Sequence, residues 1–262
     1  MSFSFDFGFE SPSAPFDKAT MVMLFESSTT RETLARTPGP AAIADTSRFV
    51  ELFEMQVGLT PYTAGLAAEV IGGIDSAAAL VRRAKEVQAA GKTPILVSET
   101  REVTGLFCET GLVAMWGKLG RKECSEAALV SSRETVLVGV RAATGAAFKS
   151  LTGDVILLTA GNIITNPGTL RDALARLSGP VHFSIDLDVL SPGEVLNERA
   201  IEPGGLSWYD LAAAVDTVFS DLRVASVEIT GTSMLAPRSP AAYLGAQLAL
   251  KIAGLVATRN AQ

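Results

Sequence analysis

Residues 181–194 read VHFSIDLDVLSPGE, a buried-strand pattern that ends in two aspartates. Asp186 and Asp188 are two residues apart, so an extended chain directs both carboxylates to the same face. Two carboxylates side by side in a dry environment repel each other and require a nearby cation or a proton. A pair of metal ions is the first candidate for that cation, provided that the chain supplies the other ligands.

Short apolar, β-branched runs like this one alternate along the chain with longer helical patterns. They are continuous apolar runs rather than polar–apolar alternations, which indicates strands covered on both faces, as in a parallel sheet. The strand candidates are residues 21–25, 94–98, 112–116, 135–140, 154–159, 181–187 and 224–229. This order of strands and helices predicts an α/β fold, a three-layer α/β/α sandwich with a mostly parallel sheet.

The helices between these strands carry recognisable end signals. They are a C-terminal glycine at Gly91, capping boxes at Thr169–Asp172 and Ser207–Asp210, and an N-cap followed by proline at Ser239–Pro240. Phenylalanines at positions 3, 5, 7 and 9 alternate with other residues and predict either an edge strand or an arm that contacts another subunit. No linker or repeat interrupts the pattern, so we predict a single domain over residues 1–262.

The composition and charge of the chain indicate which partners and which cellular location to expect. The net charge is −6 and no basic stripe is present, which argues against nucleic acid binding. The first residues lack the positive segment of a signal peptide, and no apolar run reaches the ~18 residues of a membrane span. We therefore expect a cytoplasmic protein that does not bind membranes. The hydrophobic fraction of 48% is high for a lone monomer and indicates buried subunit contacts.

Two segments resemble the late motif of the ureohydrolase family, which contains arginases and agmatinases. They are SIDLDVLSP, residues 184–192, and IEPGGLSWYDLAAAV, residues 201–215. VEIT at 227–230, ETVLVGVR at 134–141 and RTPGPAAI at 36–43 extend the resemblance over most of the chain. The resemblance implies an arginase-like sheet of about eight strands. It also implies two Mn²⁺ or related ions, held by six side chains, whose bridging hydroxide attacks a guanidinium carbon.

Four of the six ligands that the resemblance implies are missing from this chain. PILVSETRE, residues 94–102, takes the place of the family's GGDHS motif, so Arg101 stands where the first histidine ligand belongs. LVAMWGKLGR, residues 112–121, takes the place of the strand and the DAHxD motif that follows it. The residues that replace the three ligands there are Gly117, Leu119 and Arg121.

The remaining histidine does not complete a metal site. His182 is the only histidine of the chain, and it lies four residues before Asp186. That separation is about 13 Å along an extended strand, too far for both side chains to bind one ion. We therefore predict no metal and no other cofactor in this chain.

Cations stand where the ligands are missing. We expect Arg101, together with Arg121 or Lys118, to fill the former metal cavity and to neutralise the aspartates, since a pair of charges 4 Å apart attracts by about 4 kcal/mol at an effective dielectric of 20. Glu228 corresponds to a family residue that orients the substrate, and contact with Arg101 would be its simplest use here. The residues of this predicted ion-pair site are Asp186, Asp188, Arg101, Arg121, Lys118 and Glu228.

This pattern predicts a chain without catalytic residues of its own. It resembles the metal-less subunits of two-component amidinohydrolases such as metformin hydrolase, which work beside a ligand-complete ureohydrolase paralogue. We therefore expect a subunit of a trimer- or hexamer-type assembly, whose partner carries two Ni or Mn ions and hydrolyses C–N bonds of linear amidines. Two alternatives stay open: a metal-free module that binds guanidinium groups or amines, and an active, urea-releasing amidinohydrolase with a rearranged metal site.

Overall fold

A computed structural model of the protein describes residues 14–28, 39–51, 53–73, 75–107, 110–120, 134–151, 155–195, 202–233 and 235–260. The chain divides into two compact units. We call them the terminal unit, Met1–Glu99 with Thr232–Gln262, and the central unit, Thr100–Gly231. The phenylalanines at positions 3, 5, 7 and 9 and the predicted site residue Arg121 lie outside the described residues.

The terminal unit is built, in its described residues, on three parallel strands with β1 in the middle. The strands are β1 (Met21–Ser28), β2 (Leu66–Gly73) and β3 (Thr93–Val97). The helices are α1 (Gly39–Thr46), α2 (Ser76–Ala89) and α10 (Pro240–Asn260), with short 3₁₀ helices at Phe16–Lys18, Ser47–Phe49 and Pro61–Ala64.

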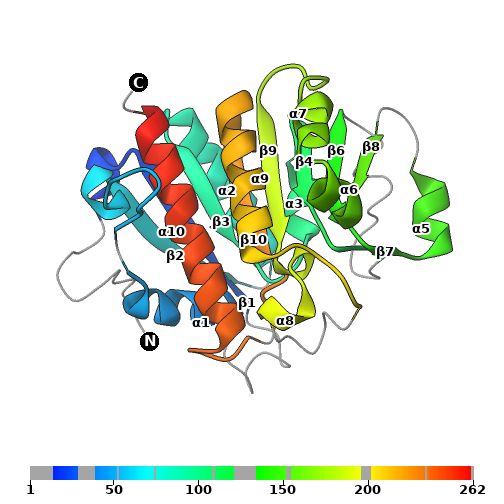
Figure 1. The fold of residues 1–262 in the computed structure, drawn as a ribbon. Helices are drawn as coiled ribbons and strands as arrows, with labels where there is room; N and C mark the ends of the chain where they lie inside the picture. The colour runs from blue at the N-terminus through cyan, green and yellow to red at the C-terminus, as the bar shows by residue number, and fades with distance from the viewer. Residues whose placement is uncertain are drawn as a thin grey trace. The chain divides into compact units, whose positions relative to one another are not determined.

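Chain order explains why helices cover both faces of these strands. The step from β1 to β2 runs one way along the sheet, and the step from β2 to β3 runs the other way, past β1. Right-handed crossovers that run in opposite directions place their helices on opposite faces. Accordingly, α1 packs with α10 on one face, and α2 packs against all three strands on the other (Figure 1).

The central unit has five parallel strands and one short parallel pair in its described residues. The spatial order is β10 (Val224–Thr230), β9 (Val181–Asp186), β4 (Gly111–Met115), β6 (Thr135–Val140) and β8 (Val155–Thr159). The short pair joins β5 (Lys118–Leu119) to β7 (Ala142–Ala143). The helices are α3 (Glu102–Leu106), α5 (Gly145–Ser150), α6 (Ala160–Thr165), α7 (Gly168–Leu174), α8 (Pro192–Val195) and α9 (Trp208–Asp221), with a 3₁₀ turn at Leu187–Val189.

The predicted α/β class with about eight mostly parallel strands is confirmed by the described residues. Each of the predicted strands is present within a few residues of its expected bounds. Besides the two-residue strands β5 and β7, the sequence did not reveal β2, whose sequence LAAEVIGG is rich in alanine and glycine, both poor strand formers. It is a strand because β1 pairs with it along its whole length, so tertiary pairing overrides local propensity.

Most of the predicted helix ends are confirmed. They are Gly91 with φ +74°, the reciprocal Ser207–Asp210 capping box of α9, and the Ser239 hydroxyl that caps α10. The box expected at Thr169–Asp172 is wrong, because Thr169 lies inside α7 and donates its hydroxyl hydrogen to the carbonyl of Asn166. A capping box forms instead at the start of α6, between Thr159 and Asn162.

Strands β9 and β10 differ from the uniformly apolar strands that we expected. Polar side chains occupy positions 182, 184 and 186 of β9 and positions 226, 228 and 230 of β10, so each strand has one polar face. Both faces are buried nevertheless. The apolar face packs against α9, where Phe183 meets Phe219, and the polar face lies under α3, where Thr104 contacts Ser184. The central unit therefore contains a polar strand surface that is buried beneath α3.

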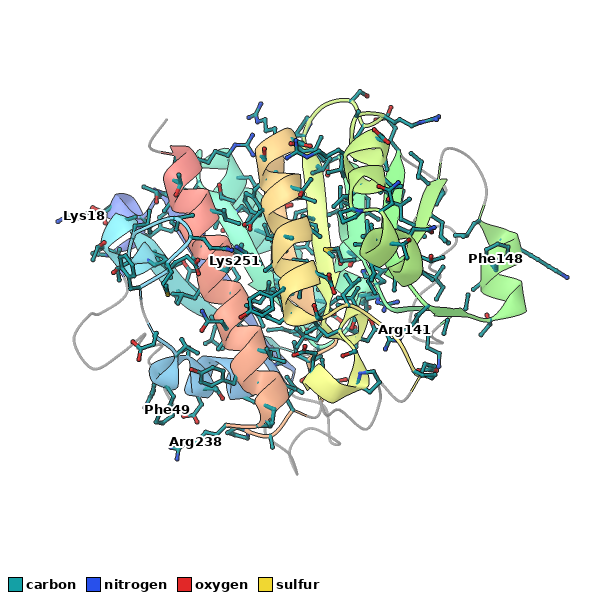
Figure 2. All side chains as sticks on the ribbon, in the orientation of Figure 1. Lys18, Phe49, Arg141, Phe148, Arg238 and Lys251 are labelled. Atoms are coloured by element: carbon teal, nitrogen blue, oxygen red, sulfur yellow. The ribbon has the colours of Figure 1, made fainter. Side chains whose placement is uncertain are left out.

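Helix α10 has the length and the apolar composition of a membrane span, with a mean hydropathy of 1.4 over its best window. However, 72% of that window is buried inside the protein. Its only charged residue in the buried stretch, Lys251, donates to the side-chain oxygen of Gln56 (Figure 2). The apolar surface of α10 is thus used for packing within the fold.

Two adjacent isoleucines of α6 provide a matched test of this packing. Ile163 is 4% exposed and Ile164 is 51% exposed. We expect Ile163→Ala to lower the free energy of unfolding by about 2–5 kcal/mol, and Ile164→Ala to change it by less than about 0.5 kcal/mol. Helix propensity changes equally in both variants, so the difference between their unfolding free energies, measured in urea, reports the effect of burial. Equal losses would contradict the packing described for α6.

Candidate functional site

The strand order of the central unit reverses at the boundary between β4 and β9. From β4 the chain moves outward to β6 and β8, and it then returns to β9 and continues to β10 on the other side. Parallel α/β sheets bind ligands at such a reversal, beyond the carboxyl ends of the strands. Residues 116–118 directly follow β4. Asp186 is the last residue of β9, and Asp188 lies in the 3₁₀ turn that follows it. Two of the predicted site segments therefore meet at this point.

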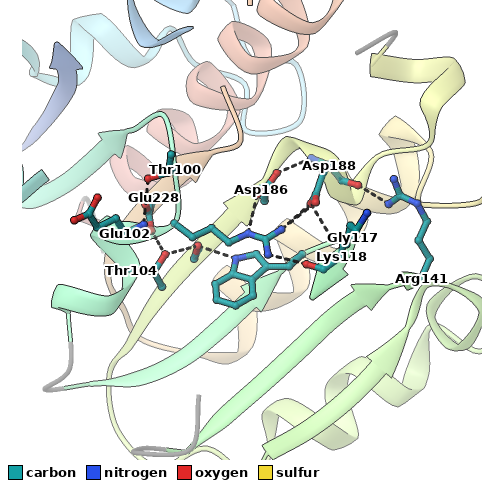
Figure 3. A network of polar contacts seen from close by, with 12 residues as sticks. Thr100, Glu102, Thr104, Gly117, Lys118, Arg141, Asp186, Asp188 and Glu228 are labelled. Atoms are coloured by element: carbon teal, nitrogen blue, oxygen red, sulfur yellow. Dashed lines mark hydrogen bonds and ion pairs between the residues drawn. The ribbon is translucent and has the colours of Figure 1, made fainter. Parts of the chain in front are cut away.

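Arg101, the residue before α3, places its guanidinium between the two aspartates (Figure 3). Its Nε donates to Asp186 Oδ2 at 2.7 Å. Its Nη2 donates to both carboxylate oxygens of Asp188, at 3.1 and 3.0 Å. Its Nη1 donates to the main-chain carbonyl of Lys118 at 2.7 Å. One planar guanidinium therefore ties together the ends of β4 and β9, a geometry that a lysine ammonium does not reproduce.

These ion pairs are buried. The side chains of Arg101, Asp186 and Asp188 are 2%, 0% and 7% exposed. The indole ring of Trp116 lies 4.5 Å from the guanidinium carbon and adds a cation–π contact on the face of the group. We call Asp186, Asp188, the Lys118 carbonyl and the Trp116 ring the Arg101 cradle. Because a buried charge without its partner is costly, Arg101 and the two carboxylates stabilise each other.

Main-chain groups hold the two carboxylates in place independently of Arg101. The Asp188 amide donates to Asp186 Oδ1 at 2.8 Å, and the Gly117 amide donates to Asp188 Oδ1 at 2.9 Å. Gly231 has φ +74°, and a Cβ there would collide with the Asp186 carboxylate. Glycine is therefore required at position 231 both for its backbone conformation and for space.

A second guanidinium lies beside the first. Arg141, the residue after β6, donates from Nη1 to the main-chain carbonyl of Asp188 and from Nε to the carbonyl of Glu202, the latter at 3.2 Å (Figure 3). The Arg141 guanidinium occupies the space that a side chain at Gly117 would need. Arg141 thus brings a second positive charge to this end of the sheet, through the main chain of Asp188 rather than through its carboxylate.

Lys118 does not join the aspartates, contrary to the expectation from the sequence. Its main-chain carbonyl faces Arg101, and its side chain is 38% exposed and forms an ion pair with Glu202. The hydrogen bond from Lys118 lowers the pKa of the Glu202 carboxyl. The other expected cation, Arg121, lies outside the described residues. Arg101 is therefore the predicted cation that contacts both aspartates among the described residues.

Glu228 lies in a second polar network, on the polar face of β9 and β10. Thr104 of α3 donates to Glu228 Oε2, and His182 Nε2 lies 3.4 Å from the same oxygen. His182 Nδ1 is 2.8 Å from the Ser226 hydroxyl, and its ring stacks on Phe107 at 4.6 Å. His182 is thus a buried residue with polar partners, whereas the expected contact of Glu228 with Arg101 stays a prediction.

Ser184 connects the two networks. The Trp116 indole donates to the Ser184 hydroxyl at 3.1 Å, and that hydroxyl is 3.2 Å from Thr104 Oγ1. A chain of hydrogen bonds therefore runs from the Trp116 ring of the Arg101 cradle, through Ser184 and Thr104, to Glu228. Arg101 directly precedes α3 and Thr104 lies within it, so the position of α3 depends on both networks.

Sequence reasoning missed several residues of the site, among them Arg141, Trp116 and Thr104. Arg141 directly follows a predicted strand, so inspecting every strand end would have revealed it. Trp116 is the last residue of the predicted strand 112–116 and was not among the predicted site residues. Thr104 gave no signal, because a threonine near a short helix is common and only the fold brings it to Glu228.

The described residues do not fit the two-metal centre that the family resemblance implies. Both aspartates already bind the guanidinium of Arg101, which has donors only and is no metal ligand. Within the described part of the chain, no group of three or more histidine, cysteine, aspartate or glutamate side chains is placed to hold a metal ion.

Solved structures of amidine-processing enzymes share this fold. Agmatine ureohydrolase of Thermoplasma volcanium is 16% identical, with a TM-score of 0.74 over 95% of this chain and 94% of that chain. Proclavaminate amidino hydrolase from Streptomyces clavuligerus is 15% identical, with a TM-score of 0.73 over 98% and 99%. Trypanosoma cruzi formiminoglutamase with Mn²⁺ is 13% identical, with a TM-score of 0.75 over 92% and 94%.

The chain belongs to the arginase family, since the sequence model of that family matches residues 99–254, more than half of its length. The match includes Arg101, both aspartates and Glu228. Curated proteins gave no match. Family membership and fold are thus established, and they leave the activity of this chain to be argued from its own residues.

The buried ion pairs predict a large loss of stability when Arg101 is removed. We expect Arg101→Met to lower the free energy of unfolding by about 3–5 kcal/mol, because it leaves two buried carboxylates without their cation. Arg83→Met is the matched control, since Arg83 also forms an ion pair, with Glu69 at 2.7 Å, but is 26% exposed. Because solvent screens this partly exposed pair, we expect it to contribute only about 1 kcal/mol. Urea unfolding of both variants measures these changes. Similar losses of unfolding free energy would contradict the burial of the Arg101 ion pairs.

The Lys118–Glu202 pair predicts a change in titration. Because the hydrogen bond lowers the folded-state pKa of Glu202, its contribution is present above the ordinary glutamate pKa and is lost as the pH falls through the lowered value. We expect Lys118→Met to raise the pKa of Glu202, measured by carboxyl NMR. Glu134, whose pKa is lowered by hydrogen bonds from Ser178, should titrate as before. An unchanged pKa of Glu202 would show that Lys118 is not its partner.

Proposed function

We propose that this chain is a non-catalytic subunit of the arginase family that assembles with a metal-dependent paralogue and supports its hydrolysis of guanidines or biguanides. One observation carries the proposal: the guanidinium of Arg101 binds Asp186 and Asp188, the two positions that match metal ligands of the family. Arginine stays protonated under all ordinary conditions and cannot serve as a base or a ligand.

The chemistry of the family depends on a hydroxide that two ions generate together. A chain with one histidine and with both remaining carboxylates bound to arginine lacks the means to hold those ions. In the proposed assembly the partner subunit carries the two Ni or Mn ions. This chain then contributes folding energy to the complex, since a partner that binds only the native state stabilises it by mass action.

Large apolar side chains on the surface support assembly with another chain. Monomeric proteins expose such residues singly, whereas groups of them favour contacts with other proteins. Among the described residues they are Phe49, Phe53, Met55, Val70 and Tyr243 of the terminal unit and Phe148, Ile164 and Tyr209 of the central unit. Figure 2 labels Phe49 and Phe148. A trimer- or hexamer-type assembly would cover part of this surface.

The two other readings have less support among the described contacts. A module that binds free guanidinium groups would need unoccupied carboxylates, and Asp186 and Asp188 are engaged by Arg101. An active enzyme with a rearranged metal site would need a new cluster of ligands, and the described residues contain none.

Co-expression with a paralogue that bears the GGDHS and DAHxD motifs tests the proposal. We expect a stable hetero-oligomer that hydrolyses a guanidine or biguanide, and an isolated chain that releases no urea with added Mn²⁺ or Ni²⁺. Activity should be lost when the GGDHS histidine of the paralogue is replaced, because the partner holds the ions.

Two results would count against the proposal. One is a chain that purifies only as a homo-oligomer and alters the activity of no paralogue. The other is urea release by the complex after the histidine of the paralogue is replaced, since the reaction would then take place on this chain.

A further inference from the structure

The Arg101 cradle provides a hydrogen-bond acceptor for every nitrogen of the guanidinium group. Asp186 accepts from Nε, Asp188 accepts from Nη2, and the Lys118 carbonyl accepts from Nη1, so every nitrogen has its own acceptor. Trp116 lies against the face of the same group. Acceptors around the edge and an aromatic ring on the face together match the shape of a planar, delocalised cation.

We infer that the cradle is a guanidinium-specific binding site that the chain fills with its own side chain. It follows that a free guanidinium ion enters the cradle when the side chain of Arg101 is truncated. The inference concerns the recognition chemistry of this site and does not require a partner subunit. The partner experiment can therefore fail while this inference holds, and the reverse is also true.

The cradle persists without Arg101 because other groups orient its members. The amides of Gly117 and Asp188 hold the two carboxylates, at 2.9 and 2.8 Å. The indole of Trp116 is fixed by its hydrogen bond to Ser184 at 3.1 Å. A variant with a truncated Arg101 side chain therefore presents a preorganised set of acceptors. Preorganisation favours binding of a small ion because it lowers the cost of ordering the site.

Charge favours a monovalent cation in this position. The group that fills the cradle in the native chain, the guanidinium of Arg101, is a monovalent cation that contacts both carboxylates. Arg141, which contacts the main-chain carbonyl of Asp188, brings a second positive charge nearby and so lowers the charge that an ion in the cradle must supply. A divalent ion needs several oxygen ligands around it, and the indole face of Trp116 offers none. An ammonium ion carries the right charge but directs its donors tetrahedrally, so it does not reach the edge acceptors and stack on the ring at once.

The test is ligand rescue of Arg101→Ala. We expect about 20 mM guanidinium chloride to raise its melting temperature by at least about 3 °C and to change its tryptophan fluorescence, since the ion would lie against Trp116. Equal concentrations of ammonium chloride should have no such effect, and neither should Mn²⁺. The native chain and Arg83→Ala control for effects of guanidinium on the solvent. Rescue by Mn²⁺ to the same extent, or no shift with guanidinium, overturns the inference.

A second variant covers the case in which Arg101→Ala does not fold. Arg101→Lys keeps the charge but removes the planar fork, and it should melt nearly as far below the native chain as an uncharged substitution does. Full stability of Arg101→Lys would show that the cradle requires only a positive charge, and it would overturn the inference. Where Arg101→Ala is recovered only as unfolded protein, refolding with guanidinium should restore folded material, and failure to do so counts equally against it.

Discussion

The guanidinium of Arg101 between two buried carboxylates is the interaction on which the centre of this protein depends. Two negative charges at the end of β9 would repel each other strongly in a dry environment, and the fold keeps them because a cation is built in. That single group joins segments from three parts of the chain: the start of α3, the turn after β4 and the end of β9. The glycine at position 231 makes room for the Asp186 carboxylate.

Much of the fold could be predicted because apolar runs and helix caps are local signals. The strands with β-branched sequences and the Ser207–Asp210 cap of α9 are examples. Strand β2 could not be predicted, because its pairing with β1 rather than its composition makes it a strand. The polar faces of β9 and β10 could not be predicted for a related reason. Ser184 and Glu228 contact Thr104 of α3, and His182 contacts Ser226, so their partners come together only in the folded chain.

The candidate site could be predicted where a motif carried it and not where main-chain geometry decided. Arg101 and the two aspartates are in positions that the family pattern identifies. The direction of the Lys118 side chain depends on how the chain turns after β4, which leaves its carbonyl toward Arg101 and its ammonium toward Glu202. Arg141 is joined to the site through the carbonyl of Asp188, and a main-chain acceptor has no signature in the sequence.

The absence of a side chain at position 117 limits which single substitutions this site can accept. The sequence resemblance places an aspartate of the family pattern at this position, and in this chain even a Cβ there would collide with the Arg141 guanidinium and the Asp188 carbonyl. A Gly117→Asp substitution alone therefore creates a steric conflict before it creates a ligand. A metal site built here would require Arg101, Gly117 and Arg141 to be replaced together, so a protein engineer could not reach it one substitution at a time.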